Sequence, residues 1–460
     1  MANKIITWKY AIDNFNPYLK APLPSSIELN KCLTKNSLTL NYNIGTNDLS
    51  GYSTNQLIPN TSINFDTYGY THSNTTSTVR DIYEDPNGYI IHVNDSGHGG
   101  ISGYKVSRTT FTGAMALTGF TLRYNSWVRS ICDTKDGYLV FVGNFSDSGR
   151  HCIAKIRISD GQLMNASNSS FNTSTGPNLA IYDAVFNGKN HIYIGGEFTQ
   201  YKGETITRIT KINKDTAIRD TSFKVAINDN RINCLEYSNN MIYAGGTFVN
   251  ISDTTISKLT VNRFFRANDE TGLIDRTFSS NLGTAFNSDV CVIKVLPNGK
   301  ILVGGAFTTF KGVSQNRLIM LNSDGTKDTS FNIGTGFDNT VWAIEFDPNM
   351  NRIYVGGNFG VYKGESSNNK LIRLNLDGTK DTSFNTGNGF NREVYTIKLS
   401  FKQQIYVGGS FTNYKSVGVR QIVRLKRNGD LDTGGQDIYI DPNPQVRIEI
   451  PPGTGGTNSN

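Results

Sequence analysis

The chain has 460 residues, of which 37% are apolar and only 18% are charged, and its formal net charge is +7. The charged share lies below the roughly 25% of an average domain, and Gly, Asn, Ser and Thr take its place, as in turn-rich all-β proteins. No run of Lys or Arg gathers the positive charge and no stretch approaches 18 apolar residues, which argues against a nucleic-acid partner and against membrane insertion.

Residues 1–58 come before the repeats and do not share their pattern. Within them Leu38, Leu40, Tyr42 and Ile44 alternate with polar residues, as in a half-buried strand. The first residues lack the apolar core of a signal peptide, so we expect synthesis in a cytoplasm. Five scattered cysteines do not resemble a disulfide framework. We interpret residues 1–58 as an attachment segment.

One short strand recurs along the rest of the chain. It is a run of β-branched and aromatic residues that ends in two glycines, with a phenylalanine two residues later. Such residues favour strands, and paired glycines let a neighbouring sheet or backbone come close. The clear copies are Ile192–Phe198, Ile242–Phe248, Ile301–Phe307, Ile353–Phe359 and Ile405–Phe411, and Phe141–Phe145 is a fainter copy that has lost one glycine.

An earlier strand precedes each copy, and these first strands count the repeat. They begin at Val79, Val128, Ile181, Ile232, Val290, Val341 and Val394. The sequence therefore contains seven units at steps of 49 to 58 residues. We assign the longest step to an insertion at Arg263–Thr271 in the fourth unit.

The sixth unit illustrates the expected layout of four strands. The first three are Val341–Phe346, Arg352–Phe359 and Lys370–Leu376, and the fourth centres on Asp381–Phe384. The dipeptide Asp377-Gly378 predicts a hairpin turn before the fourth strand. Short meandering sheets joined by tight turns are typical of a β-propeller.

The two ends of the repeat complement each other. The seventh unit reaches Leu431–Thr433 and then has Gly434-Gly435 where other units have Ser-Phe, while a matching segment, Asn60–Phe65, precedes the first unit. Sharing one blade between both ends of a chain leaves no unpaired edge. We predict an all-β, seven-bladed β-propeller of four-stranded blades over residues 59–433, its ring closed by an N-terminal strand, with non-repeat segments at 1–58 and 434–460.

The repeat resembles a known family. Gly304–Phe331 and Gly356–Phe384 share GGxFxx(Y/F)KG, then five or six residues, then LIxLNxDGTKDTSF. This unit is similar to the delta-sixty repeat of bacterial and phage β-propellers over about residues 60 to 433, most closely in units three, five, six and seven. Units one and two depart from it, and Val93–Asp95 replaces the glycine pair. The resemblance implies the propeller fold and says little about function.

Two polar clusters are candidate metal sites, each with a simpler interpretation. His92, Asp95 and His98 lie close in the first unit, although such residues are usually surface polar groups. Asn322–Asp328 and its copy Asn375–Asp381 faintly resemble a calcium loop. Asp-Gly, however, makes a hairpin turn, and the later aspartate can bond the backbone of the next turn. We expect no metal and no cofactor, and the absence of GxSxG and HExxH motifs argues against an enzyme.

The loop between the second and third strands repeats an aromatic residue followed by lysine. Because strands alternate in direction, this loop shares one face with the loop before each first strand. Aromatic faces stack on sugar rings or peptide side chains, and lysine reaches hydroxyl or carboxylate oxygens. In the alternative interpretation the aromatics wedge between blades and the lysines are only solvated. The predicted binding residues are Tyr201, Lys202, Phe310, Lys311, Tyr362, Lys363, Tyr414, Lys415, Phe337 and Phe390.

Three functions fit these features. The first is a non-enzymatic structural and adhesive propeller in a phage virion, at the tail or a tail appendage, docked on other virion proteins through its two end segments and touching a host surface glycan. The second is a lectin or adhesin of the bacterial cell surface. The third is a glycan lyase or hydrolase, which would need carboxylates that converge at the central channel; the first strands offer Asp81, Asp133 and Asp183.

Overall fold

The computed structural model describes residues 30–34, 37–41, 78–95, 106–109, 126–147, 150–164, 171, 176–366, 369–419 and 421–432. The chain divides into two compact units, Met1–Pro59 and Asn60–Asn460. Within Met1–Pro59, β1 (Asn30–Thr34) pairs antiparallel with β2 (Ser37–Asn41), which includes the predicted strand residues Leu38 and Leu40. The predicted closing strand at residues 60–65 and the tail from residue 434 lie outside the described residues.

The compact unit Asn60–Asn460 contains one antiparallel sheet for each sequence repeat, and these sheets share one plan. The middle strand pairs with the first strand on one side and with the third strand on the other. The first strands are β3 (Thr78–Glu84), β6 (Val128–Asp133), β9 (Ile181–Phe186), β15 (Ile232–Ser238), β20 (Val290–Val295), β25 (Val341–Asp347) and β28 (Val394–Leu399). The middle strands are β4 (Ile90–Asp95), β7 (Tyr138–Asp147), β10 (His191–Gly196), β16 (Met241–Gly246), β21 (Ile301–Gly305), β26 (Arg352–Gly357) and β29 (Ile405–Gly409). The third strands are β5 (Val106–Thr109), β8 (Arg150–Arg157), β13 (Ile209–Asn213), β19 (Phe264–Asn268), β24 (Leu318–Leu321), β27 (Leu371–Leu374) and β32 (Ile422–Leu425).

In three of the described repeats a short hairpin lies in the chain between the middle and third strands. They are β11 (Gln200–Tyr201) with β12 (Glu204–Thr205), β22 (Thr309–Phe310) with β23 (Val313–Ser314), and β30 (Asn413–Tyr414) with β31 (Val417–Gly418). A further three-stranded sheet joins β14 (Ala226–Ile227), β17 (Asn250–Asp253) and β18 (Ile256–Thr260). No helix in the described part of the chain is long and apolar enough to cross a membrane.

The prediction of a fourth strand is wrong for the sixth unit. After β27 the backbone makes one isolated bridge, between Leu374 and Lys380, and then turns. The carboxylate of Asp381 causes the turn, because it accepts hydrogen bonds from the backbone N–H of Ser383 at 3.0 Å and from its hydroxyl at 2.7 Å. Phe384 is buried in the core beyond this turn.

The predicted insertion at Arg263–Thr271 is also wrong, since this stretch contains β19, the regular third strand of its sheet. The extra residues of the fourth unit form the longer hairpin β17–β18. The segment after β19 ends in a short helix, α2 (Arg276–Leu282), whose N-cap Asp275 accepts a hydrogen bond from the Phe278 backbone N–H. Phe278 and Leu282 of α2 are buried. The insertion was misplaced because the spacing between first strands shows how long a unit is, but not where within the unit its extra residues lie.

The two glycines of each pair serve different contacts. A Cβ atom on Gly356 would lie 2.5 Å from Val394 Cγ1 and 3.0 Å from Ile397 Cδ1, both in the first strand of the next sheet. A Cβ atom on Gly357 would lie 2.2 Å from the backbone oxygen of Thr340, which precedes the first strand of its own sheet. The first glycine therefore lets the neighbouring sheet pack closely, and the second lets the backbone before the first strand of its own sheet pass close by.

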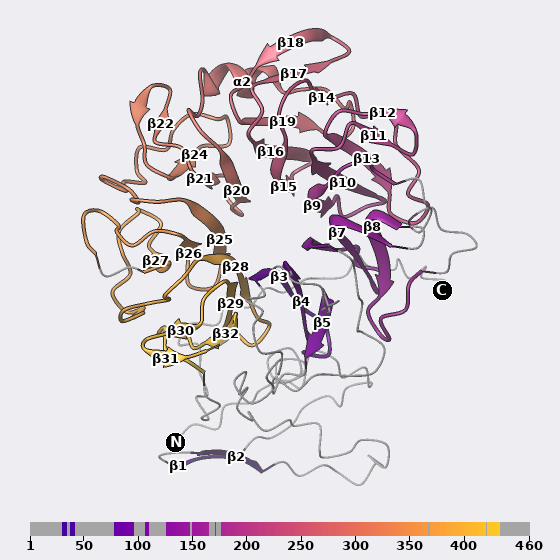
Figure 1. Ribbon diagram of the computed structural model, residues 1–460. Coiled ribbons are helices and arrows are strands. Elements are labelled where there is room, and N and C mark those ends of the chain that lie inside the picture. The colour runs from indigo at the N-terminus through magenta and orange to yellow at the C-terminus, as the bar shows by residue number, and fades with distance from the viewer. Residues whose placement is uncertain are drawn as a thin grey trace, which may run out of the picture. The chain divides into compact units, whose positions relative to one another are not determined.

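The contact at the first glycine recurs from sheet to sheet, and Figure 1 shows the sheets in sequence order with their first strands toward a common centre. It also joins the last sheet to the first, because a Cβ atom on Gly408 would lie 2.6 Å from Val79 Cγ1 and 3.1 Å from Ile82 Cδ1. Val79 and Ile82 share a buried cluster with Tyr406 and Ile422 of the last sheet. The apolar core thus lies between sheets, where each sheet covers its neighbour.

We expect the substitution Gly356→Val to overpack this contact, because its branched side chain would enter space held by Val394. Such overpacking typically costs about 1–3 kcal/mol of unfolding free energy. Gly418→Val is a suitable control, since the nearest atom to a Cβ at Gly418 is Asn413 Oδ1 at 3.9 Å. Denaturant unfolding of both variants checks this; an unchanged midpoint for Gly356→Val would contradict close packing at the first glycine.

Candidate functional site

Each first strand carries one residue that its middle strand skips. In β25, Val341 pairs with Gly357 and Ala343 with Gly356, so Trp342 between them has no partner and forms a β-bulge. The same register shift occurs in all the other first strands. We call the skipped residues the bulge set: Arg80, Arg129, Tyr182, Asn233, Cys291, Trp342 and Tyr395.

All members of the bulge set line one pocket of about 200 Å³. Bulges commonly re-aim side chains beside binding sites, and here they turn one side chain from each sheet toward the same space. Arginines and aromatic rings meet there: the Arg80 guanidinium lies 4.0 Å from the Tyr395 ring centroid, and the Arg129 guanidinium lies 4.7 Å from that of Tyr182. The pocket is therefore suited to a polar ligand.

Two carboxyl groups line the same pocket, but their oxygens are engaged by neighbouring sheets. Asp81 accepts from the backbone N–H of Ile131 at 2.9 Å, and Asp183 accepts from that of Leu235 at 2.8 Å. The Ser130 hydroxyl also donates to Asp183, at 2.8 Å. Burial raises the pKa of Asp183 to about 7 and raises the pKa of Asp81, against these hydrogen bonds, which lower it. The contacts make both groups inter-sheet links.

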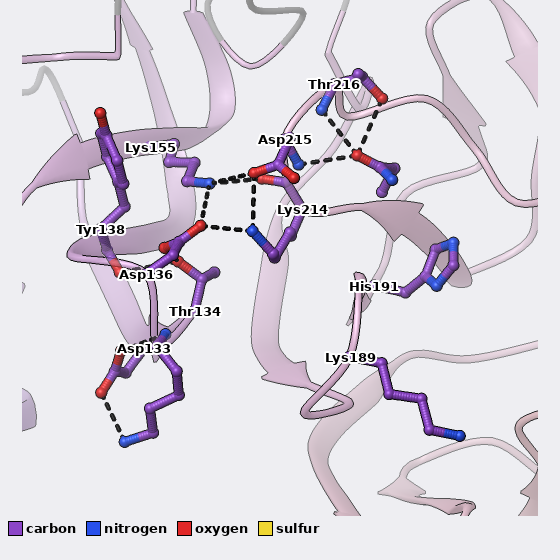
Figure 2. Close-up of polar contacts among 12 residues, drawn as sticks. Asp133, Thr134, Asp136, Tyr138, Lys155, Lys189, His191, Lys214, Asp215 and Thr216 are labelled. Carbon is purple, nitrogen blue, oxygen red and sulfur yellow. Dashed lines mark hydrogen bonds and ion pairs between the residues drawn. The ribbon is translucent and has the colours of Figure 1, made fainter. Parts of the chain in front are cut away.

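Buried cations on the third strands form a second system that the sequence patterns did not reveal. Lys155 of β8 is fully buried, and its Nζ donates to the backbone oxygen of Lys214, in the next sheet's turn, at 2.8 Å. Figure 2 shows Lys155 between Asp136 and Asp215, each 3.3 Å away, with Lys214 bridging the same two carboxylates. Two cations and two anions balance one another at this junction.

The same bond to the next sheet recurs at equivalent positions. Lys211 donates to the Asp269 backbone oxygen at 3.0 Å, Arg266 to that of Ser323 at 2.6 Å, and Arg373 to that of Arg427 at 2.5 Å. Met320 occupies the position in the fifth unit and has no such group. The available signal in the sequence was a pair of basic residues three apart, which occurs as Arg208 with Lys211, Arg263 with Arg266 and Lys370 with Arg373.

An aspartate of the following turn neutralises several of these cations. Asp381 lies 2.8 Å from Arg373 and Arg352, Asp220 lies 3.1 Å from Lys211, and Asp275 lies 2.8 Å from Arg266. Burial raises the pKa of Asp381, but hydrogen bonds from Ser383 and Arg352 and the charge of Arg373 outweigh it and lower the pKa to about 2. The role of Asp381 is therefore structural.

The structure brings the predicted aromatic residues together but buries them. Phe337 and Tyr362 share an isolated bridge, their ring centroids are 4.5 Å apart, and each is at most 2% exposed. Phe390 and Tyr414 repeat the arrangement at 4.4 Å. Phe310 and Tyr201 are equally enclosed. These rings have no free face for a sugar in this arrangement; they anchor the hairpins, as when the Tyr201 hydroxyl donates to the backbone oxygen of Ala217 at 2.7 Å.

The predicted lysines lie at the tips of the same hairpins. Lys202, Lys311, Lys363 and Lys415 all have φ near 50°, in the left-handed region, and each is followed at the tip by Gly or Ser. Lys311 is exposed, and the other three are half-buried. Their Nζ atoms lie 5.5 to 5.8 Å from the centroid of the preceding aromatic ring. Lys415 also pairs with Asp430 at 2.7 Å. Each of these loops therefore places one lysine at its tip.

The candidate metal groups have other partners in the described residues. His92 is buried, its ring Nδ1 lies 3.2 Å from Asn94 Oδ1, and burial lowers its pKa to about 4. Asp95 pairs with Arg80, and His98 lies outside the described residues. Asp328 pairs with Lys300 at 2.6 Å. The described residues contain no group of three His, Cys, Asp or Glu side chains suited to a metal.

A family described as "Domain of unknown function (DUF5122) beta-propeller" matches residues 296–331, 351–384 and 404–434. These segments contain the middle and third strands of the last three sheets, β21 with β24, β26 with β27, and β29 with β32. The match and the all-β sheet plan identify the fold as a β-propeller. No curated protein matches the chain.

Two solved structures are similar over most of their length. The computationally designed Ika8 protein is 12% identical, with a TM-score of 0.44, and the match covers 75% of this chain and 96% of that protein. The WD40 β-propeller domain of Doa1 is 13% identical, with a TM-score of 0.41, and the match covers 76% of this chain and 93% of the domain.

We expect Asp381→Asn to destabilise the protein by about 3–5 kcal/mol, because it leaves the buried Arg373 without its anion. Asp377→Asn, which alters an exposed turn in the same unit, is the control and should stay within about 0.5 kcal/mol. Because the folded pKa of Asp381 is lowered, its stabilisation is present above the unfolded pKa near 4 and is lost as pH falls toward 2. Melting temperatures between pH 5 and pH 2 should fall less in Asp381→Asn than in the parent; parallel curves would contradict this role.

Proposed function

We propose that this protein is a non-enzymatic structural and adhesive propeller of the delta-sixty repeat type, and that its setting is a phage virion, at the tail or a tail appendage. In this proposal the two end segments, residues 1–58 and 434–460, dock on other virion proteins, and the repeated sheets contact a host surface. The alternative setting is the bacterial cell surface, where the same geometry would serve a lectin or adhesin.

The bulge set is the observation that carries the adhesive role. The residue just before each of its members is Val or Ile in every unit, whereas the bulge residues are two Arg, two Tyr, Asn, Cys and Trp. Packing keeps the first position uniform between copies, whereas the skipped position has no partner in the sheet and differs from copy to copy. Varied polar and aromatic groups that line one pocket fit ligand recognition.

A glycan-active enzyme is the second alternative. Asp183, with its pKa raised to about 7, and Asp81 are the carboxyl groups such an enzyme would use. Both already accept backbone N–H donors from an adjacent sheet. A group that holds two sheets together is poorly placed to exchange protons with a substrate, which favours the binding function.

We further propose that the sheets close into a seven-bladed ring, sealed by residues 60–65. The packing of Gly408 on Val79 and Ile82 supports closure. Deleting residues 1–58 should leave a folded propeller, whereas deleting residues 1–66 should expose an edge in the last sheet and promote aggregation. Calorimetry and light scattering compare the two; identical behaviour would place the seal elsewhere.

The adhesive role predicts that the hairpin lysines contribute to attachment. Replacing Lys202, Lys311, Lys363 and Lys415 together with Gln should weaken binding to host cells without unfolding the protein, because several weak contacts act together on a repeated target. Replacing Lys135, Lys189 and Lys402, which lie at the opposite ends of the sheets, should change attachment little. Cell-binding assays on folded variants measure this; normal attachment by the quadruple variant, or its loss from assembled particles, would overturn the assignment.

A further inference from the structure

A second pocket, of about 480 Å³, lies beside the bulge set and is rich in arginine. Arg208, Arg231 and Arg263 line it, and Glu197 is the one acidic residue of its lining. None of the three guanidinium groups takes part in an ion pair among the residues that the structure describes. The pocket therefore carries a net positive charge.

This arrangement differs from that of the buried cations on the same strands. Lys211 lies three residues after Arg208 and has Asp220 and Asp269 as anions, at 3.1 and 2.9 Å. Arg266 lies three residues after Arg263 and has Asp275. Around β13 and β19, therefore, one cation is neutralised and a second, three residues earlier, lines the pocket without an ion pair. The two unpaired arginines are available for a ligand.

The backbone and the hydrogen bonds add to this picture. Arg208 and Arg263 have φ of 65° and 82°, in the left-handed region that side chains other than Gly rarely adopt. Arg317 and Lys370 have the same conformation at the equivalent positions, so the repeat itself fixes the backbone from which Arg208 and Arg263 reach the pocket. The Arg263 Nη1 group donates to the backbone oxygens of Thr247 at 2.6 Å and Phe248 at 3.3 Å, which fixes the guanidinium in the pocket lining. Its buried Nε has no hydrogen-bond partner in the structure, and neither has the Nε of Arg317, which lies outside the pocket.

We propose that this pocket binds an anionic sugar of a surface polysaccharide, with the carboxylate or phosphate held by Arg208, Arg231 and Arg263. Arginine pairs bidentately with both groups. The other lining residues suit the sugar ring: Leu179, 44% exposed, offers an apolar patch for ring C–H groups, and Glu197 and Asn230 can bond hydroxyls. The volume lies in the usual range for ligand pockets. This inference rests on the proposed adhesive function and names its ligand class.

The test measures binding of the full-length protein by calorimetry to three probes of equal length: a hexuronate oligosaccharide, a glycerol-phosphate oligomer and a neutral glucan. We expect binding of one or both acidic probes, weakened by salt, and none of the neutral probe. The acidic probe that binds identifies the source of the anion. Binding of neutral and acidic probes alike, binding of neither acidic probe, or tighter binding of a single-stranded oligonucleotide would overturn the proposal.

Arg263→Gln is the decisive variant, and Arg317→Gln is its matched control. Arg317 has the same place before its third strand, a φ of 70° and the same type of bond, to the backbone oxygen of Ala306, but it does not line the pocket. The two variants should therefore shift the melting temperature alike. Arg263→Gln should weaken acidic binding on the order of ten- to a hundredfold, as for loss of a charged hydrogen bond, and Arg317→Gln less than about twofold. Equal weakening would overturn the site.

The cell-attachment assay separates this inference from the function on which it rests. A protein that attaches to cells but binds neither acidic probe refutes the anionic-sugar site and leaves the adhesive function standing. A protein that binds an acidic probe through Arg263 but attaches to no cell keeps the site and refutes host adhesion.

Discussion

Contact between one sheet and the next at a residue without a side chain is the constraint on which the other features of this protein depend. A three-stranded sheet by itself is marginal, because its apolar faces stay exposed to water. At Gly356 the following sheet comes so close that Val394 fills the space of the missing Cβ atom. Since burial of apolar surface is the main stabilising term, the units fold as neighbours. The buried cations are a consequence, because sheets this close enclose the third strands.

Cations on and beside the third strands then take two different roles. Arg373 is enclosed between sheets, where an unpaired charge is costly, and it is held by Asp381 and by a backbone oxygen of the next sheet. Arg263 lies at the start of its strand, where a pocket gives access to solvent and ligand. At β19 the two roles lie three residues apart, because Arg266 pairs with Asp275 and Arg263 lines the pocket.

Much of the fold could be predicted from the sequence because its signals are local. The glycine pairs and the Asp-Gly turns mark strand ends directly, and Gly378 has the positive φ that such a turn requires. The prediction of a fourth strand was wrong because Asp381 accepts a hydrogen bond from the backbone N–H of Ser383. The resulting turn takes the following residues out of the sheet. The helix α2 was missed because its N-cap aspartate occupies the same place as Asp381 and looks identical in sequence.

The candidate site was harder to predict, because it depends on geometry between units. The skipped position in each first strand changes which way Trp342 and its counterparts point, and strict alternation cannot show such a shift. Tyr362 was predicted to bind a ligand because its place in a loop suggested that it is exposed. In the structure it is buried and forms a bridge with Phe337. Arg208 and Arg263 went unnoticed because their ion-pair status depends on residues far away in the chain.

The direction of the inter-sheet bond has a consequence for how such proteins grow. Units two, three, four and six hold a donor for the unit after them, and units three and four also hold the acceptor for the unit before them, as Arg266 and the backbone oxygen of Asp269 show. Tandem copying of a whole unit in the gene therefore creates a new junction that is already matched, whereas copying from the middle of a third strand would separate donor from acceptor. Met320 shows that one junction tolerates loss of the donor once its neighbours are in place. Duplication followed by divergence at the skipped position is thus an evolutionary path on which each intermediate can fold.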